Sequence, residues 1–301
     1  MNMKKWCLFL TLYACMCLLA ACAASGEDGG APDRLPQDES GEDTVVCRVI
    51  SVLDDSTLIL AEEGSESGIY TVTPGEQLLT LDGADFDAAA PGAYQALPGG
   101  SLAGTTVRVT FDGGVQESWP MGFSGITALD FSTEDFDDLG ALYLQVLEDL
   151  WDVDSGLNED ITELGVDLSQ TRLTGSEREA VAYAFGAAHG LMAMETTYDQ
   201  LAEEGYLTPV SISTPAGEGE EGPALYQWED GCLFSIAETG EPVVFNLPDL
   251  GPGDRMPDYD GVTFDAQKWC SPLGAYYFMD CTAISTGGHW GSYTVGSEAI
   301  S

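Results

Sequence analysis

The chain has 301 residues, of which 9 are basic and 51 are acidic, so its formal net charge is −42, and 44% of its residues are hydrophobic. That hydrophobic content is typical of a folding chain, and the length suggests about two domains. The negative charge repels phosphate backbones and no basic stripe offsets it, so the composition excludes a nucleic-acid partner. Adsorption of the protein surface to anionic lipid headgroups is disfavoured for the same reason.

The N-terminus has the pattern of a secretory signal peptide over residues 1–21. Lys4 and Lys5 precede an apolar run over residues 6–21 that contains no acidic residue. The run is about 16 residues long, shorter than the roughly 20 that a spanning helix needs, and it ends in small residues. We therefore expect a cleaved export signal rather than a permanent transmembrane helix.

The signal ends in Leu19, Ala20, Ala21 and Cys22. This tetrapeptide resembles the lipobox of bacterial lipoproteins, in which a lipoprotein signal peptidase cleaves before a cysteine that has been lipidated. The resemblance implies that Cys22 is the lipidation site and the first residue of the mature chain. Two or more acyl chains give stable anchoring at about 0.8 kcal/mol per buried CH₂. The alternative is an ordinary cleaved signal with an incidental cysteine.

Residues 22–43 predict a flexible acidic tether. The segment combines Gly, Pro, Ser and acids, and Leu35 is its only large apolar residue. Removal of the signal takes away Lys4 and Lys5, which leaves Lys268 as the only lysine and a net charge of 7 − 51 = −44. We expect a soluble surface that attracts cations and a folded part held away from the membrane.

Residues 44–131 have the pattern of a small all-β domain. Its β-rich runs are residues 45–53, 57–60, 69–73, 105–111, 115–119 and 125–130. The Asp-Gly-Gly at residues 112–114 predicts a hairpin. Five or six short strands in this length suggest a small closed barrel, which resembles the OB-like domains of exported bacterial lipoproteins of uncharacterised function. Acids outnumber Arg48 and Arg108 here, so an oligonucleotide ligand fits poorly, and the alternative to binding is a spacer barrel.

Residues 132–301 predict an α+β domain. Ser132 with Asp135 marks a helix start over residues 133–151, and Thr174 with Glu177 marks a second helix that reaches residue 188. A third helix is expected at residues 198–204. The predicted strands follow at residues 225–229, 232–237, 243–247, 262–266, 275–284 and 293–299, with a hairpin at residues 230–231. Helices followed by strands favour helices packed on one face of an antiparallel sheet.

Three pieces of this second segment resemble a C-terminal domain of lipoproteins from Gram-positive anaerobes. They are residues 142–158, 264–269 and 274–283. That domain has no assigned activity, so the resemblance supports the domain boundary and implies no chemistry.

No catalytic motif stands out in the sequence. His189 and His289 are the only histidines, and neither lies in an HExxH or CxxC context. A formal GxGxxG at residues 217–222 lies in a proline-bounded loop whose glutamates repel a pyrophosphate. The sequence therefore predicts no catalytic residue.

The residues after the first predicted helix resemble a calcium loop. The run DVDSGLNEDITE places oxygen-bearing side chains at loop positions 1, 3, 7, 9 and 12, which are Asp152, Asp154, Asn158, Asp160 and Glu163. Gly156 replaces an oxygen ligand at position 5, and Leu157 replaces the glycine of position 6. The alternative to calcium is a solvated acidic turn, and no other cofactor is expected.

Four cysteines fall in the folded part: Cys47, Cys232, Cys270 and Cys281. Four thiols allow two disulfides in three connectivities. Because Cys47 lies in the first segment and the others in the second, at most one bridge forms within a domain. The pattern predicts no disulfide scaffold and leaves the pairing open.

Together these patterns predict a lipoprotein anchored through Cys22 on the extracytoplasmic face of a bacterial membrane. With an export signal, a tether and no catalytic motif, we expect a non-catalytic binding or interaction module of the cell envelope. Its partner would be an envelope protein, a peptide or a glycan. The alternative is an extracytoplasmic hydrolase that acts on envelope glycans through acidic residues.

Overall fold

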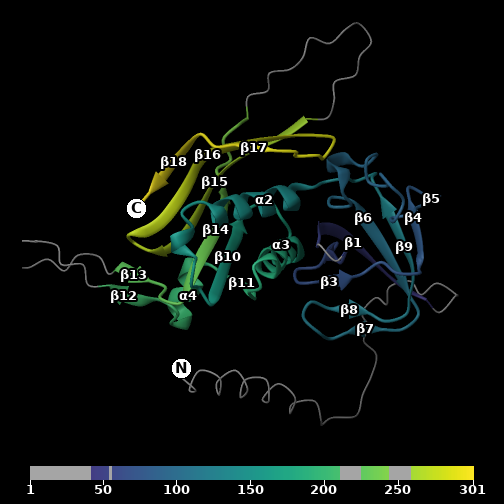
Figure 1. Cartoon of the computed structure of the whole chain (residues 1–301), viewed down its shortest axis with the longest axis horizontal. Coiled ribbons are helices and arrows are strands. Elements are labelled where there is room, and N and C mark those ends of the chain that lie inside the picture. Colours follow the sequence, from purple (N-terminus) through teal and green to yellow (C-terminus); the bar gives the residue numbers. More distant parts are fainter. Residues whose placement is uncertain (1–41, 54–55, 211–224, 244–258) are drawn as a thin grey trace, which may run out of the picture. The chain divides into compact units, whose positions relative to one another are not determined.

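The computed structural model describes residues 42–53, 56–210, 225–243 and 259–301 (Figure 1). Contacts divide the chain into Met1–Gln37 and Asp38–Ser301, and every described residue belongs to the second unit. The expected signal peptide, Cys22, nearly all of the expected tether, the GxGxxG loop and most of the predicted strand at 243–247 lie outside the described residues. The described part is mostly β, with 44% of it in strands and 18% helical.

The first sheet has seven strands in the order β3-β2-β1-β6-β9-β4-β5. They are β1 (Asp43–Val52), β2 (Leu58–Glu62), β3 (Ile69–Val72), β4 (Leu78–Leu81), β5 (Ala84–Asp85), β6 (Thr106–Phe111) and β9 (Ile126–Ser132). All neighbours are antiparallel except β4 and β9, which are parallel. The inward side chains of these strands form an apolar core around Leu60, Val107 and Leu129.

The prediction of a small closed barrel over residues 44–131 is wrong. The sheet is open, with β3 and β5 at its two ends, and no sheet of the described residues closes into a barrel. The Asp-Gly-Gly at residues 112–114 does not connect a hairpin, because β6 pairs with β1 and β9. Instead β7 (Val115–Gln116) and β8 (Gly122–Phe123) pair with each other, and the Asp112 amide donates to the Gly125 carbonyl where the chain returns.

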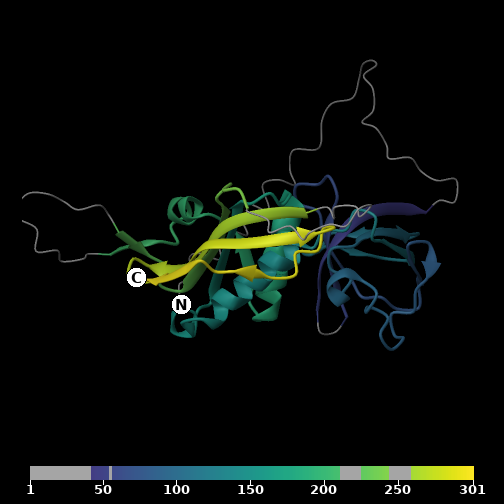
Figure 2. The ribbon, with the colours of Figure 1, turned by 90° about the horizontal axis from the view of Figure 1, so that it is seen from above.

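The second sheet has the order β11-β10-β14-β15-β16-β17, with β18 also paired to β16. Its strands are β10 (Glu163–Gln170), β11 (Ala193–Glu195), β14 (Gly231–Glu238), β15 (Tyr259–Ser271), β16 (Gly274–Thr286), β17 (Tyr293–Thr294) and β18 (Ser297–Ile300). The long strands β15 and β16 run side by side (Figure 2). β10 is parallel to both of its neighbours, so the prediction of an antiparallel sheet is wrong and the sheet is mixed.

The strand before the predicted hairpin at residues 230–231 does not join this sheet. It is β13 (Leu225–Gln227), which pairs with β12 (Thr208–Val210) instead of with β14. The hairpin prediction is therefore wrong. A turn signal reports that the chain reverses locally, but it does not report which strands pair across the sheet.

Three α-helices lie in the described residues: α2 (Leu139–Asp152), α3 (Gly175–Ala188) and α4 (Tyr198–Glu204). The predicted capping box of Thr174 and Glu177 is present at the start of α3, and α4 has the predicted bounds. α2 begins later than predicted, because the Asp137 and Asp138 amides donate to carbonyls outside the helix, those of Gly104 and Gly288. None of these helices is long and apolar enough to cross a bilayer.

Both faces of the second sheet pack against other elements, and side chains that alternate along its strands contribute to each face. On β14, Cys232 and Phe234 join the core formed with α2 and α3, whereas Leu233 packs with Leu201 of α4 and with Trp228. The expectation that the helices cover one face of the sheet is therefore wrong. The same alternation determines which residues of β15 face α2.

Candidate functional site

The predicted calcium loop at residues 152–163 contacts the ammonium group of Lys268. Lys268 is fully buried, with 0% of its surface exposed. Its Nζ donates to the backbone oxygens of Trp151 and Asp154 at 3.4 and 3.1 Å, and also to that of Val153. It further donates to Oδ1 of Asn158 at 2.7 Å. The loop thus receives a cation from the protein's own chain.

The strand β15 brings Lys268 to this loop. Phe264 and Ala266 precede it on the same face, and Lys268 pairs in register with Phe234, so its aliphatic stem continues an apolar stripe. Its ammonium reaches the C-terminal end of α2, where the last carbonyls have no intrahelical donor. α2 has no basic residue of its own in its last turn. Lys268 therefore caps α2, and its positive charge interacts favourably with the negative end of the helix dipole. Burial lowers the pKa of the ammonium below its ordinary value.

The five predicted calcium ligands have different surroundings. Asn158 bonds to Lys268, and Glu163 accepts a hydrogen bond from Trp228 Nε1 at 2.7 Å. The remaining three, Asp152, Asp154 and Asp160, are exposed. Within the ranges that the structure describes, no group of three or more His, Cys, Asp and Glu side chains is placed to hold a metal.

We expect calcium and magnesium to shift the melting temperature equally, because Lys268 already occupies the Asn158 oxygen, two carbonyls of the loop and the carbonyl of Trp151 just before it. Charge screening by the acidic surface does not distinguish the two ions, whereas a specific site stabilises by RT ln(1 + [L]/Kd). The measurement is thermal melting in excess EDTA and then in millimolar calcium or magnesium. A calcium-specific rise that Asp152→Ala removes would contradict this expectation.

Both histidines bond to carboxylates. His289 Nδ1 lies 2.6 Å from Asp138 Oδ2, and the other oxygen of Asp138 accepts the Trp290 amide at 2.7 Å. His189 ends α3 and bonds Glu148 at 2.9 Å, where burial raises the pKa of the Glu148 carboxyl above its ordinary value. Asp138 and His289 line a small hollow of about 230 Å³. Sequence reasoning missed the Asp138 pair, because no motif marks one acid among 51.

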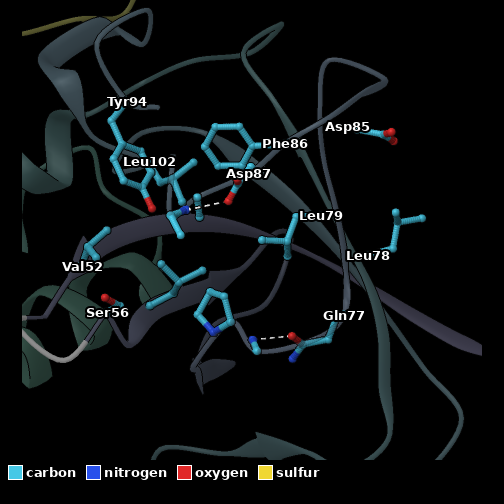
Figure 3. A pocket seen from close by; sticks show the side chains of 15 residues that line it. Val52, Ser56, Gln77, Leu78, Leu79, Asp85, Phe86, Asp87, Tyr94 and Leu102 are labelled. Atoms are coloured by element: carbon cyan, nitrogen blue, oxygen red, sulfur yellow. Dashed lines mark hydrogen bonds between the residues drawn. The ribbon is translucent and has the colours of Figure 1, made fainter. Parts of the chain in front are cut away.

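A larger hollow of about 600 Å³ opens on the first sheet (Figure 3). It is lined by the end of the β1–β2 hairpin, the β3–β4 connection and residues 85–94. Its apolar wall includes Leu58, Leu79, Leu102 and Phe86, and Figure 3 shows the Tyr94 ring beside Leu102. Leu58 and Leu102 are buried in the core of the sheet, so this part of the hollow rests on a fixed structure.

The polar groups of the hollow are acidic or neutral. Asp85 and Asp87 are exposed, and no Lys, Arg or His is among the lining residues. Asp87 Oδ1 accepts the Ala89 amide at 3.0 Å, which orients that carboxylate. Phe86 contacts Tyr94 edge-on at 5.8 Å between ring centroids. In the described part of the chain the Tyr94 hydroxyl has no hydrogen-bond partner, so it is available to a ligand.

From β4, the Leu79 side chain points toward the hollow, whereas Leu78, which is 57% exposed, points to the other side of the strand (Figure 3). No family model, curated protein or solved structure matches the chain. No sequence signal marks this hollow, because β4 and β5 contain no strong strand pattern and the segment after them has no motif. Lys268 had a weak signal: it is the only lysine beyond the predicted signal peptide, and it follows the predicted strand at residues 262–266.

Proposed function

We propose that this protein is an extracytoplasmic lipoprotein, anchored in a bacterial membrane through Cys22, whose folded part is a non-catalytic binding module. The observation that supports the binding role is the hollow of about 600 Å³ with an apolar wall. Ligand sites are concave, mostly apolar and about 300 to 1,000 Å³ in volume, with a few polar groups that orient the ligand. Asp87 and the Tyr94 hydroxyl supply such polar groups here.

The charge of the hollow favours a basic peptide segment of an envelope protein as the ligand. Asp85 and Asp87 lie at the hollow without a cationic lining residue, and the whole chain has a net charge of −42. The leucine-like side chains of such a peptide would pack against the apolar wall of the hollow, and its lysine-like side chains would pair with these carboxylates. The charge would also speed the encounter of such a peptide with the protein at low salt.

The anchor is tested by fractionation of Cys22→Ala. Without the thiol no diacylglyceryl group can be attached, so we expect this variant to leave the membrane fraction for the soluble extracytoplasmic fraction. Wild-type protein should remain with the membranes, because its acyl chains bind stably. A Cys22→Ala protein that is still membrane-bound after signal cleavage would contradict the anchor.

Leu79→Ser is expected to weaken peptide binding about tenfold, because Leu79 faces the hollow and a leucine contact of about 1.4 kcal/mol is lost. The probe is a short peptide of alternating leucine and lysine, titrated into the purified protein by calorimetry. Leu273→Ser is the matched control: Leu273 is 77% exposed and lies in the β15–β16 turn, outside the hollow. Equal loss in both variants, or equal binding of a leucine–glutamate peptide, would contradict the proposed site.

Envelope-glycan hydrolysis remains a second candidate because of one carboxyl pair. Burial and the neighbouring Glu195 raise the pKa of Glu179, and Glu179 Oε2 is buried with no hydrogen-bond partner among the residues that the structure describes. Glu195 stays paired with Arg178 at 2.9 Å. Two neighbouring carboxyl groups in different surroundings, one of which has a raised pKa, are the arrangement that acid catalysis uses. Turnover of cell-wall oligosaccharides that Glu179→Gln abolishes would favour this candidate over the binding module.

A further inference from the structure

Cys232 and Cys270 face each other on neighbouring antiparallel strands. β14 and β15 pair Leu233 with Trp269, so the next pair outward in this register is Cys232 with Cys270. Residues directly opposite on such strands have their Cβ atoms about 4.5 to 5.5 Å apart, close to the roughly 3.5 to 4.5 Å that a disulfide spans. The Cys232 thiol donates a hydrogen bond to the Cys270 sulfur, and both cysteines are free.

The two thiols differ in reactivity. The hydrogen bond from Cys232 lowers the pKa of Cys270, and the Lys268 ammonium also lowers it, although burial opposes the shift. The same hydrogen bond, with burial, raises the pKa of Cys232. Cys270 is partly exposed, whereas Cys232 is fully buried. Cys270 is therefore the thiol that reacts with an external reagent, and Cys232 is the buried thiol that can react with Cys270 afterwards.

The other two described cysteines have different neighbours. Cys281 lies on β16 opposite Phe264, and burial raises its pKa to about 12. Cys47 lies on β1 in the core of the first sheet, opposite Val107. Of the three connectivities that four cysteines allow, the geometry therefore singles out the one that joins Cys232 to Cys270.

We propose that Cys232 and Cys270 form an intrachain disulfide between β14 and β15 by exchange with a low-molecular-weight disulfide. The Cys270 thiolate attacks one sulfur of the oxidant, which forms a mixed disulfide and releases a thiolate that takes up the Cys270 proton. Cys232 then loses its proton and attacks the Cys270 sulfur, which releases the second thiol. Two cysteine thiols are oxidised, and the disulfide of the oxidant is reduced to two thiols.

The bridge would join the strand that carries Lys268 to its neighbour, across positions that are 270 − 232 = 38 apart in the chain. A cross-link over such a loop restricts the unfolded chain and stabilises the folded one. This inference concerns a modification of the second sheet and does not depend on what the hollow on the first sheet binds. An extracytoplasmic location would supply the oxidising conditions that the bridge needs.

The experiment treats the purified, reduced full chain with oxidised glutathione, blocks free thiols by alkylation and maps the peptides by mass spectrometry. We expect a disulfide-linked pair of peptides that contain Cys232 and Cys270. We also expect a melting temperature roughly 5 to 10 °C higher, which dithiothreitol reverses. Cys232→Ala should stop at a mixed disulfide of Cys270 with glutathione. Cys47→Ala is the matched control, a buried cysteine outside the pair, and it should still form the bridge.

Three results would overturn the proposal. One is alkylation of both Cys232 and Cys270 after oxidation of the folded wild-type chain. Another is a wild-type mixed disulfide at Cys270 that Cys232 never displaces. The third is a bridge from either residue to Cys281 instead. Because each is measured on the wild-type chain, the proposal remains testable even if Cys232→Ala does not fold.

Discussion

Lys268→Met is expected to lower the free energy of unfolding by about 3 kcal/mol. Methionine keeps the buried stem, but it removes the donor of the hydrogen bonds to the end of α2 and to Asn158. Asn158 is only 4% exposed, so its amide oxygen would be left buried and unpaired at a cost of about 1 to 3 kcal/mol. The charge at the helix C-terminus adds up to about 2 kcal/mol, and the removed cost of burying an ammonium offsets part of this sum.

The measurement is urea unfolding followed by circular dichroism, with the slope of the transition compared between variants. Asp160→Asn is the control, because Asp160 lies on the same loop but is exposed, and we expect a change within about 0.5 kcal/mol. If Lys268→Met unfolds at the wild-type urea concentration, the loop does not depend on the lysine. The prediction of calcium binding by residues 152–163 would then be favoured over the lysine contact as the role of this loop.

Asp138→Ala is expected to lower the free energy of unfolding by about 2 to 3 kcal/mol. Asp138 is 8% exposed and accepts hydrogen bonds from the Trp290 amide and from His289 Nδ1. Its own amide donates to the Gly288 carbonyl, so this residue fixes the loop before β17 to the start of α2. Alanine would leave the Trp290 amide buried without an acceptor, and an unpaired buried donor costs about 1 to 3 kcal/mol.

Asp138→Asn separates the hydrogen bond from the charge, because an amide oxygen can still accept the Trp290 amide. We expect this variant to lose about half as much stability as the alanine variant, in the same urea titration. Glu134→Ala is the control, because Glu134 is an exposed acid of the same segment. A wild-type transition for Asp138→Ala would show that the contacts of Asp138 do not fix the loop.

Local sequence signals predicted the helix boundaries that depend on neighbouring residues. Thr174 with Glu177 forms a capping box by contacts three residues apart, and α4 is followed by Gly205, whose φ of 81° favours glycine. The start of α2 was missed because amides of residues 137 and 138 bond to distant carbonyls. A capping box depends on residues close in sequence, whereas the start of α2 depends on hydrogen bonds to residues far away in the chain.

The sheet topology could not be predicted in the same way. The predicted runs of the first segment overlap β1, β2, β3, β6, β7 and β9, but β4, β5 and β8 were missed. In addition, β4 pairs with β9 in parallel, and β10 pairs with β11 and β14 in parallel. Parallel pairs need long connections, so no turn residue marks them. The barrel was predicted from the number of short strands and the antiparallel sheet from helices followed by strands, and neither pattern specifies which strands pair. The two predicted hairpins, at residues 112–114 and 230–231, are also wrong because their flanking strands pair elsewhere.

The candidate site was predicted only in part. The spacing of residues 152–163 predicted a calcium loop, and the structure shows that one of its five residues, Asn158, bonds to Lys268 together with three nearby backbone carbonyls. The sequence could not show that this cation is an ammonium brought by β15 from more than 100 residues away. The hollow on the first sheet depends on β4, which pairs non-locally, so its lining could not be assembled from spacing alone.

The most direct measurement of the proposed binding role is hydrogen exchange of the protein with and without the leucine–lysine peptide, with the mass of the peptide followed in the same samples. A binding module that uses the hollow predicts slower exchange at residues 74–79 and 85–94, unchanged exchange at residues 268–290, and an intact peptide. Protection confined to other segments, or conversion of the peptide to products, would contradict a non-catalytic module that binds through the first sheet.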